Sequence, residues 1–336
     1  MIKTSAPGKV ILFGEHAVVY DKLGIATSID KRAYVTVSNG KEGITIESKN
    51  LGLKKLLSEK KLFTLLKDIE NLKTKKDFER IKEISKDKLL ASFFVVAKLT
   101  EKFGFRGLKI LIDSEIPKNL GSSSSIFSAI VLGVSIFLGK KISKKDIAKI
   151  ANEGDIVAHG GLSSGIDANT VTYGGYLKYK KSEGIIPLDI NFEIPLVIVD
   201  SGEPARTGET VPYINKLKEE NPGLIEEVLD RLDEISRFGL DAIKAQNLKK
   251  IGRLMINYYQ ELKKLNISTA SLDKIVQIAL DHQVLGVKPT GGWGGGCCIV
   301  LTKNQKEIFN LIKEFKINGF KSFQSKIGVE GVKLVI

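Results

Sequence analysis

Three glycine-rich segments, far apart in this chain of 336 residues, constrain its fold more than any other feature. They read SAPGKVILFGEHAVVY at residues 5–20, PKNLGSSSS at 117–125 and KPTGGWGGGC at 288–297. Small residues at the start of a helix let backbone N–H groups approach phosphate oxygens, and the helix dipole adds a positive end. Glycines in the last segment would bring a second stretch of backbone equally close. The segments together predict a phosphate-binding cleft.

Each segment also has a simpler interpretation. Lys9 alone could be an ordinary lysine at a strand edge, and serines after a glycine also cap ordinary helices. The third segment alone could be a hairpin without a ligand. The presence of all three in one chain favours the phosphate interpretation over these alternatives.

The composition is that of a globular protein large enough for two lobes. Hydrophobic residues make up 43% of the chain and charged residues 27%, without the bias that marks disorder. A formal charge of +13 would suit nucleic acid, but the lysines alternate with glutamates and aspartates. We therefore interpret the lysines as solvated helix faces and expect no nucleic-acid partner, although an anionic substrate would benefit from the same field.

No segment has the pattern of a membrane span or a secretion signal. The longest apolar stretch begins at Ile126 and is interrupted by serines and a glycine, and the N-terminus lacks a charged leader with an apolar region. We expect a cytoplasmic protein without membrane contact. The two cysteines, Cys297 and Cys298, are adjacent, which gives neither a disulfide framework nor a zinc site.

The hydrophobic pattern predicts helices and strands in alternation, and hence an α+β fold with a domain boundary between residues 180 and 192. Short β-rich runs fill the first forty residues. The predicted helices cover residues 51–88, 89–97, 126–138 and 225–238. The predicted strands cover residues 107–113, a hairpin at 171–179, and residues 194–200, 297–302 and 332–336.

The opening segment resembles, nearly residue for residue, the first motif of the mevalonate kinases, in their archaeal type, within the GHMP kinase superfamily. The resemblance spans nearly the whole chain apart from residues 51–88. It implies a two-lobed GHMP kinase fold, with an ATP-binding N-terminal lobe of ribosomal protein S5 domain 2-like type at residues 1–185 and a ferredoxin-like α+β lobe at residues 186–336. A helical elaboration at about 51–88 would belong to the first lobe.

The second and third segments are similar to the phosphate loops of that family. The resemblance implies that Ser122 and Ser123 are the two loop serines and that Ser123 helps to hold Mg²⁺. The second segment is about two residues shorter than the family pattern, and Asn119 replaces its first loop glycine. Trp293 stands where the family has glycine, and an indole there needs room or must turn outward over the cleft. The residues assigned to the nucleotide are Pro117, Leu120, Gly121, Ser122, Ser123, Ser124, Gly291 and Gly294.

Residues 159–169, HGGLSSGIDAN, resemble the family segment that carries the catalytic aspartate, here Asp167. A positioned carboxylate can orient a hydroxyl and take its proton, and Lys9 beside it would favour alkoxide character as the γ-phosphoryl group loosens. We expect Lys9 and Asp167 to be the catalytic pair. An isolated aspartate in such a sequence would more often be a turn residue or a cap.

The remaining site residues also come from the resemblance. Asp155 is the favoured Mg²⁺ ligand beside Ser123, with Glu153 as the alternative, because Mg²⁺ takes one or two protein oxygens together with ATP oxygens and waters. Glu15, His16 and Thr207 are assigned to the acceptor substrate. The other two histidines lack metal-ligand spacing, and we interpret them as structural.

The resemblance implies a mevalonate kinase that uses ATP and Mg²⁺ to phosphorylate the C5 hydroxyl of (R)-mevalonate in isoprenoid biosynthesis. A homodimer is compatible with it. One alternative is phosphomevalonate kinase or another GHMP kinase, whose phosphorylated acceptor would suit Arg206 beside Thr207. Another is a non-catalytic relative that binds a nucleotide or nucleic acid, suggested by the short phosphate loop, Trp293 and the charge.

Overall fold

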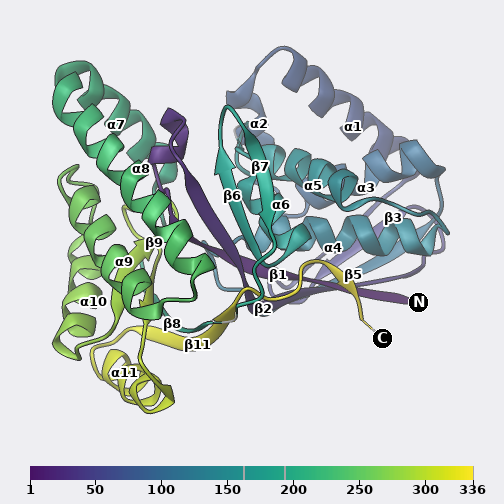
Figure 1. Ribbon diagram of the computed structural model, residues 1–336. Coiled ribbons are helices and arrows are strands. Elements are labelled where there is room, and N and C mark those ends of the chain that lie inside the picture. Colours follow the sequence, from purple (N-terminus) through teal and green to yellow (C-terminus); the bar gives the residue numbers. More distant parts are fainter. Residues whose placement is uncertain (162, 193, 336) are drawn as a thin grey trace.

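The computed structural model describes residues 1–161, 163–192 and 194–335, and it shows a mixed sheet with helices gathered at its two ends (Figure 1). Within these residues the sheet has twelve strands, and its main path runs β4-β3-β5-β2-β11-β8-β10-β9. Only the pairing of β3 with β5 is parallel. The α+β fold class predicted from the sequence is confirmed.

Groups of strands and groups of helices alternate along the chain. The strands are β1 Ile2–Phe13, β2 Gly24–Asn39, β3 Ile44–Ser48, β4 Leu53–Leu57, β5 Leu108–Ser114, β6 Tyr176–Lys180, β7 Gly184–Leu188, β8 Ile194–Asp200, β9 Gly286–Thr290, β10 Cys297–Leu301, β11 Lys321–Ile327 and β12 Lys333–Leu334. The helices are the 3-10 turn η1 Ala17–Tyr20 and α1 Glu59–Thr74, α2 Phe78–Ile84, α3 Leu90–Phe103, α4 Ser122–Phe137, α5 Lys144–Ala158, α6 Ile166–Tyr173, α7 Thr207–Glu220, α8 Pro222–Lys244, α9 Leu248–Lys263, α10 Ala270–Asp281 and α11 Gln305–Ile317.

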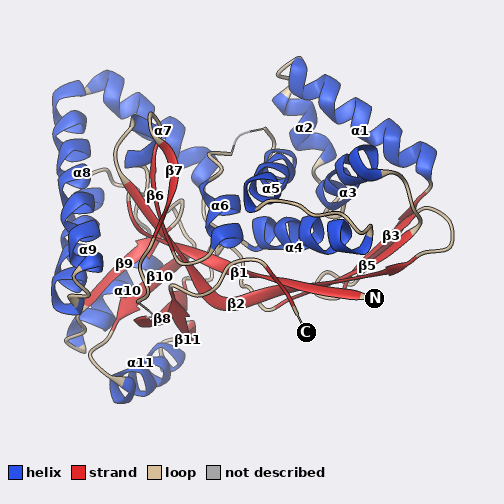
Figure 2. Cartoon of the chain, turned by 45° about the vertical axis from the view of Figure 1, so that its right-hand side comes forward, coloured by secondary structure: helices blue, strands red, loops and turns tan. Residues whose placement is uncertain are grey.

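Two groups of helices enclose two hydrophobic cores. Figure 2 shows α1 to α6 gathered over the part of the sheet that carries β3 and β5, and α7 to α10 over the part that carries β8 to β10. One core joins α3, α4 and α5 to β2, β3 and β5, and the other joins α8, α9 and α10 to β8, β9 and β10. The long strands β1 and β2 connect the two, so residues of both groups can meet at one site.

The antiparallel pair β1 and β2 positions the start of the site. Its register shifts between Pro7 and Gly8, after which Lys9 pairs with Ser28. A bulge of this kind bends a strand and redirects the side chains that follow it. Helix α4 packs directly on β1, where the Thr4 hydroxyl donates to the Ala129 carbonyl at 2.7 Å. The sheet and α4 therefore hold Lys9 beside the beginning of α4.

Close backbone packing holds helix α9 and strand β9 together on the other side of the site. A Cβ on Gly252 of α9 would lie 2.1 Å from the carbonyl oxygen of Leu285, and one on Gly286 of β9 would lie 2.4 Å from Gly252. Only glycine at both positions permits this approach. Strand β9, which leads into the third glycine-rich segment, is thereby held against α9.

Three predicted elements were wrong in part. Residues 53–57 form the edge strand β4, which pairs with β3, so the predicted helix at 51–88 begins only at α1. Its sequence, LKKLL, suits an exposed edge as well as a helix face. The predicted hairpin at 171–179 begins with the end of α6, and only β6 pairs with β7. The strand predicted at 332–336 is the two-residue β12, which pairs with β1.

None of the helices described in the structure is long and apolar enough to cross a membrane. The division into domains at residues 185 and 186 stays a prediction.

Candidate active site

The two residues predicted to react, Lys9 and Asp167, lie together. Nζ of Lys9 is 2.9 Å from Oδ1 of Asp167, which stands in the first turn of α6. The side chain of Lys9 is 7% exposed and that of Asp167 is 33% exposed. The carboxylate is therefore open to a small molecule, and the lysine supports it from the protein side. We call these two residues the open pair.

The second glycine-rich segment begins α4 directly beside Lys9. The backbone N–H of Lys9 donates to the Leu120 carbonyl at 2.8 Å. Gly121 has a φ of +78°, and a Cβ there would lie 2.7 Å from Cγ of Lys9. Asn119 has a φ of +69°, a left-handed conformation that asparagine tolerates better than most residues. Asparagine in place of the family's glycine thus keeps the turn.

The serines at the start of α4 face different partners. Oγ of Ser122 lies 3.5 Å from Oγ of Ser114, while Ser123 and Ser124 both donate to the carboxylate of Asp155, the former at 2.9 Å. Ser125 donates to the Pro7 carbonyl at 2.6 Å. Ser123 and Ser124 therefore connect the head of α4 to α5, and Pro117 lies half-buried in the loop before them.

Asp155 and Glu153 point to different surroundings. Asp155 is buried, and burial raises its pKa to about 7, while hydrogen bonds from the two serines oppose the rise and the nearby charge of Asp167 adds to it. Glu153 forms ion pairs with Lys98 at 2.7 Å and with Lys73 at 3.2 Å. Of the two candidates, only Asp155 lies beside Ser123.

A carboxylate of this kind fits a divalent cation. Among the residues that the structure describes, no group of three or more His, Cys, Asp or Glu side chains could hold a metal alone. Mg²⁺ needs fewer, since it keeps waters and takes oxygens of a bound phosphate. A cation beside Asp155 would also relieve the repulsion between that carboxylate and Asp167. The donor set therefore fits Mg²⁺ held jointly by the protein and a nucleotide.

His159 is a neighbour of the site that sequence reasoning missed. Its Nε2 lies 3.2 Å from Oγ of Ser123 and 3.9 Å from Oδ1 of Asp155. Burial lowers its pKa. The signal was present in the spacing, because His159 follows Asp155 by four residues and such residues share one face of a helix. By contrast, His282 bonds to the Ile278 carbonyl of its own helix, as a structural residue does.

The third glycine-rich segment closes on the second one. Gly291 has a φ of +89°, and a Cβ there would lie 3.9 Å from the Asn119 carbonyl oxygen. Gly294 has a φ of +65°, and a Cβ there would lie 3.0 Å from Cβ of Arg206. The two loops, distant in sequence, thus form opposite walls of one site.

A second lysine–carboxylate pair lies behind this loop. Lys288 of β9 contacts Oε1 of Glu15 and donates to the Pro289 carbonyl at 2.8 Å, and both side chains are 0% exposed. Burial raises the pKa of Glu15 and lowers that of Lys288, and the attraction between the two opposes both shifts. We call Glu15 and Lys288 the sealed pair. Lys288 is the first residue of the third glycine-rich segment, and the sequence alone predicted no role for it.

His16 and Trp293 lie next to the sealed pair. His16 is buried, and burial together with the charge of Lys288 lowers its pKa to about 4, so the ring is neutral at neutral pH. Trp293 is 0% exposed, stacks on Tyr259 and meets His16 edge to face. Of the two orientations open to the indole, it takes the inward one, because Tyr259 gives it an aromatic surface.

Two predicted neighbours of the acceptor remain. Thr207 begins α7, but its side chain lies outside the described part of the structure. Arg206, which precedes it, donates its backbone N–H to the Trp293 carbonyl at 3.0 Å. Its guanidinium is exposed and approaches Glu209 only at 3.9 Å.

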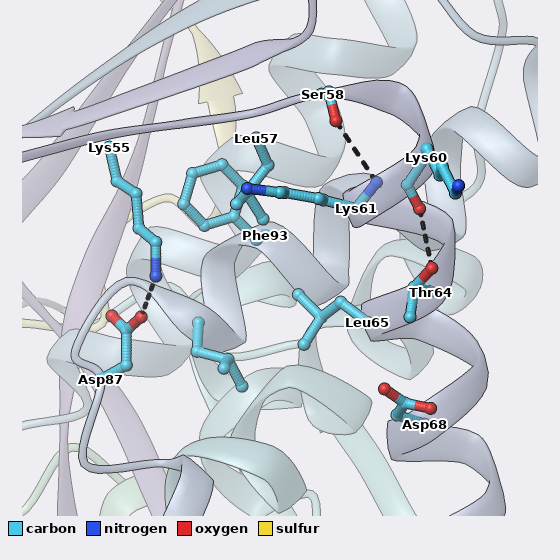
Figure 3. Close-up of a pocket in the computed structure, with 11 residues that line it drawn as sticks. Lys55, Leu57, Ser58, Lys60, Lys61, Thr64, Leu65, Asp68, Asp87 and Phe93 are labelled. Carbon is cyan, nitrogen blue, oxygen red and sulfur yellow. Dashed lines mark hydrogen bonds and ion pairs between the residues drawn. The ribbon is translucent and has the colours of Figure 1, made fainter.

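A separate cavity of about 510 Å³ lies between β4, α1 and the start of α3 (Figure 3). Its lining combines Leu57, Leu65 and Phe93 with lysines, and Nζ of Lys55 meets Oδ2 of Asp87 at one side. None of the predicted site residues lines it.

Comparisons with known proteins identify the family. The family models GHMP kinases N terminal domain and GHMP kinases C terminal match residues 89–175 and 240–321. Mevalonate kinase of Pyrococcus horikoshii is 33% identical over 99% of this chain and 97% of its own length, and that of Pyrococcus furiosus is 33% identical over 98% and 97%. The crystal structure of Methanococcus jannaschii mevalonate kinase matches with a TM-score of 0.81 and 28% identity, over 97% of this chain and 98% of that one.

Proposed function

The chain belongs to the mevalonate kinase family of GHMP kinases, and from this premise we propose how its residues transfer the γ-phosphoryl group of ATP to the C5 hydroxyl of (R)-mevalonate, giving 5-phosphomevalonate. The observation that carries the proposal is the open pair, whose carboxylate is exposed at the head of α6 while the phosphate loop begins beside its lysine.

Asp167 is the catalytic base of this proposal. Its exposed carboxylate orients the C5 hydroxyl and takes the proton that leaves it as the bond to phosphorus forms. Lys9, buried on the protein side, stabilises the negative charge that develops between the acceptor oxygen and the phosphoryl group. Its backbone N–H, bonded to Leu120, keeps the ammonium in register with the phosphate loop.

The nucleotide is held by the two glycine-rich loops. Backbone N–H groups at the start of α4, from Gly121 to Ser124, point toward the positive end of the helix dipole, where phosphate oxygens bind. Gly291 and Gly294 let the opposite wall approach the same phosphates. Asp155 and Ser123 would hold Mg²⁺, which when bound neutralises the charge of the β- and γ-phosphates.

The acceptor lies on the side of Glu15, His16 and Thr207. Neutral His16 offers one N–H donor and one acceptor nitrogen, which suits an alcohol or a carboxylate. Glu15 stays in place because Lys288 holds one of its oxygens.

One alternative keeps a specific observation in its favour. Arg206 has an exposed guanidinium, 57% accessible at the side chain, next to the acceptor side of the loop. A phosphorylated acceptor would be attracted to it. The second alternative, a nucleic-acid partner, is less well supported, because exposed lysines such as Lys49 and Lys55 are paired with carboxylates.

The test measures ATP turnover with mevalonate, phosphomevalonate, homoserine and galactose side by side, with identification of the product. Turnover that depends on mevalonate and yields 5-phosphomevalonate supports the proposal. Turnover with phosphomevalonate alone would transfer the assignment to the related kinase, and in that case Arg206→Ala should abolish it.

A further inference from the structure

Trp293 occupies a conformation that a bulky residue seldom adopts. Its φ of +55° lies in the left-handed region, and its side chain is the largest that is fully buried. Tyr259 stacks against the indole with 6.1 Å between ring centroids and 30° between planes. The neighbouring N–H of Gly294 donates to the Ile267 carbonyl at 3.1 Å. The surrounding structure therefore holds the indole in one place.

The polar atoms around this indole have no partner among the described residues. They are Nε1 of Trp293, both ring nitrogens of His16 and Oε2 of Glu15, all buried. The rings of His16 and Trp293 lie 6.5 Å apart at 80°. Folded proteins pair nearly all of their buried polar groups, and an unpaired one is costly. Four such atoms on three adjacent residues mark a place built for a polar ligand.

We propose that Trp293 is a specificity-determining residue of the acceptor site, whose indole N–H donates a hydrogen bond to an oxygen of the acceptor beside His16. This inference rests on the proposed function and adds a residue to it. An indole nitrogen donates and does not accept, so its partner is an oxygen with a free lone pair. Besides the reacting hydroxyl, mevalonate has two groups with such oxygens, its carboxylate and its tertiary hydroxyl.

The obvious competing role is that the indole merely fills space. Trp293→Phe, measured together with acceptor analogues, separates the two roles, because only the loss of a hydrogen bond depends on which acceptor group is present. Phenylalanine keeps an aromatic ring against Tyr259 but removes the N–H. The KM for mevalonate should rise about 3- to 10-fold, with kcat within about twofold and the KM for ATP unchanged, since a neutral hydrogen bond is lost from binding rather than from the chemical step. An unchanged KM for mevalonate would overturn the proposal.

A matched control changes the neighbour and keeps the indole. The hydroxyl of Tyr259 bonds to Oδ1 of Asp273 at 2.7 Å, so Tyr259→Phe perturbs the same aromatic stack without touching the proposed donor. It should leave the KM for mevalonate unchanged. Two acceptor analogues, one without the tertiary hydroxyl and one without the carboxylate, identify the accepting group, because wild type and Trp293→Phe should bind one of them equally.

A binding measurement makes the test independent of turnover. Trp293 is the only tryptophan of the chain, so its fluorescence reports on this position alone. Adding mevalonate without ATP should change the emission with the same concentration dependence that calorimetry gives. Calorimetric binding with unchanged emission would overturn the proposal.

Different results would refute the role of the indole and the proposed function. A wild-type enzyme that turns over mevalonate, with no effect of Trp293→Phe, refutes only the role of the indole. A wild-type enzyme that neither binds nor turns over mevalonate refutes both the proposed function and this inference.

Discussion

The open pair and the sealed pair have the same chemistry in opposite surroundings. Lys9 and Asp167 form an ion pair whose carboxylate is 33% exposed, whereas Lys288 and Glu15 are 0% exposed. An ion pair at the edge of a cleft can exchange its partner for a substrate at little cost, while a fully buried one loses much if either charge is left alone. The comparison teaches that exposure, rather than residue type, separates the pair that we propose to react from the pair that holds the structure.

The strongest way to break this comparison is to remove the lysine of the open pair. Lys9→Met should lower kcat about 10²- to 10⁴-fold, the range for loss of a group that stabilises transferring charge or protons. The free energy of unfolding should change little, because Asp167 can turn to water. Steady-state kinetics and denaturant unfolding check both statements, with Lys49→Met, an exposed ion-pair lysine, as the matched control.

Replacing the lysine of the sealed pair by methionine should lower the stability of the protein. Lys288→Met leaves the Glu15 carboxylate buried without its partner, which should lower the free energy of unfolding by about 3–5 kcal/mol. Adding Glu15→Gln should restore most of the loss, because no charge is then left unpaired. Urea unfolding of the single and double variants measures this. A single variant as stable as wild type would mean that Glu15 is not held as an ion.

The histidine beside the sealed pair should make stability depend on pH. The folded-state pKa of His16 is about 4, below its ordinary value of 6.5, so the unfolded chain binds the proton first as pH falls. The stability that His16 contributes is present above pH 6.5 and is lost between 6.5 and about 4, by about 3 kcal/mol in all. The free energies of unfolding of wild type and His16→Gln, measured at several pH values, isolate this contribution. The difference between the two free energies should narrow as pH falls from 6.5 to about 4 and should stay constant outside that range.

The smallest expected effect is on the reactivity of the two thiols in the strand beside the sealed pair. Burial raises the pKa of the Cys297 thiol to about 12 and that of Cys298 well above its ordinary value. Neither thiol should react with a thiol reagent at pH 8 in the folded protein, and both should react after unfolding. Rapid labelling of the native protein would show that water reaches this region, and the pair would then not be sealed.

The sequence predicted the open pair well and the sealed pair poorly. Lys9 and Asp167 each lie in a long, specific motif, so their meeting follows from the resemblance alone. The contact between Lys288 and Glu15 depends on β9 packing against α9 and on where the first segment ends, which no local pattern records. Trp293 turned inward for a similar reason, because Tyr259 stands on a different helix.

The residues on α4 and α5 were harder to predict from the sequence than the open pair and easier than the sealed pair. The choice between Asp155 and Glu153 required knowing which face of α5 meets α4, and two lysines from α1 and α3 engage Glu153 on the other side. Strand β4 was missed because its sequence, LKKLL, has no alternation of apolar and polar residues and the strand is almost fully exposed. Long-range packing, rather than local propensity, decided each of these cases.

The most direct test of the central claim compares mevalonate-dependent ATP turnover in wild type and Asp167→Asn. Asparagine keeps the shape of the side chain but removes the charge that takes the proton. The account predicts robust turnover in the wild type, a loss of at least about 10²-fold in kcat in the variant, and a smaller loss of thermal stability, because Lys9, 7% exposed, is left without its partner. Turnover by Asp167→Asn at the wild-type rate would contradict the assignment of the open pair as the reacting groups.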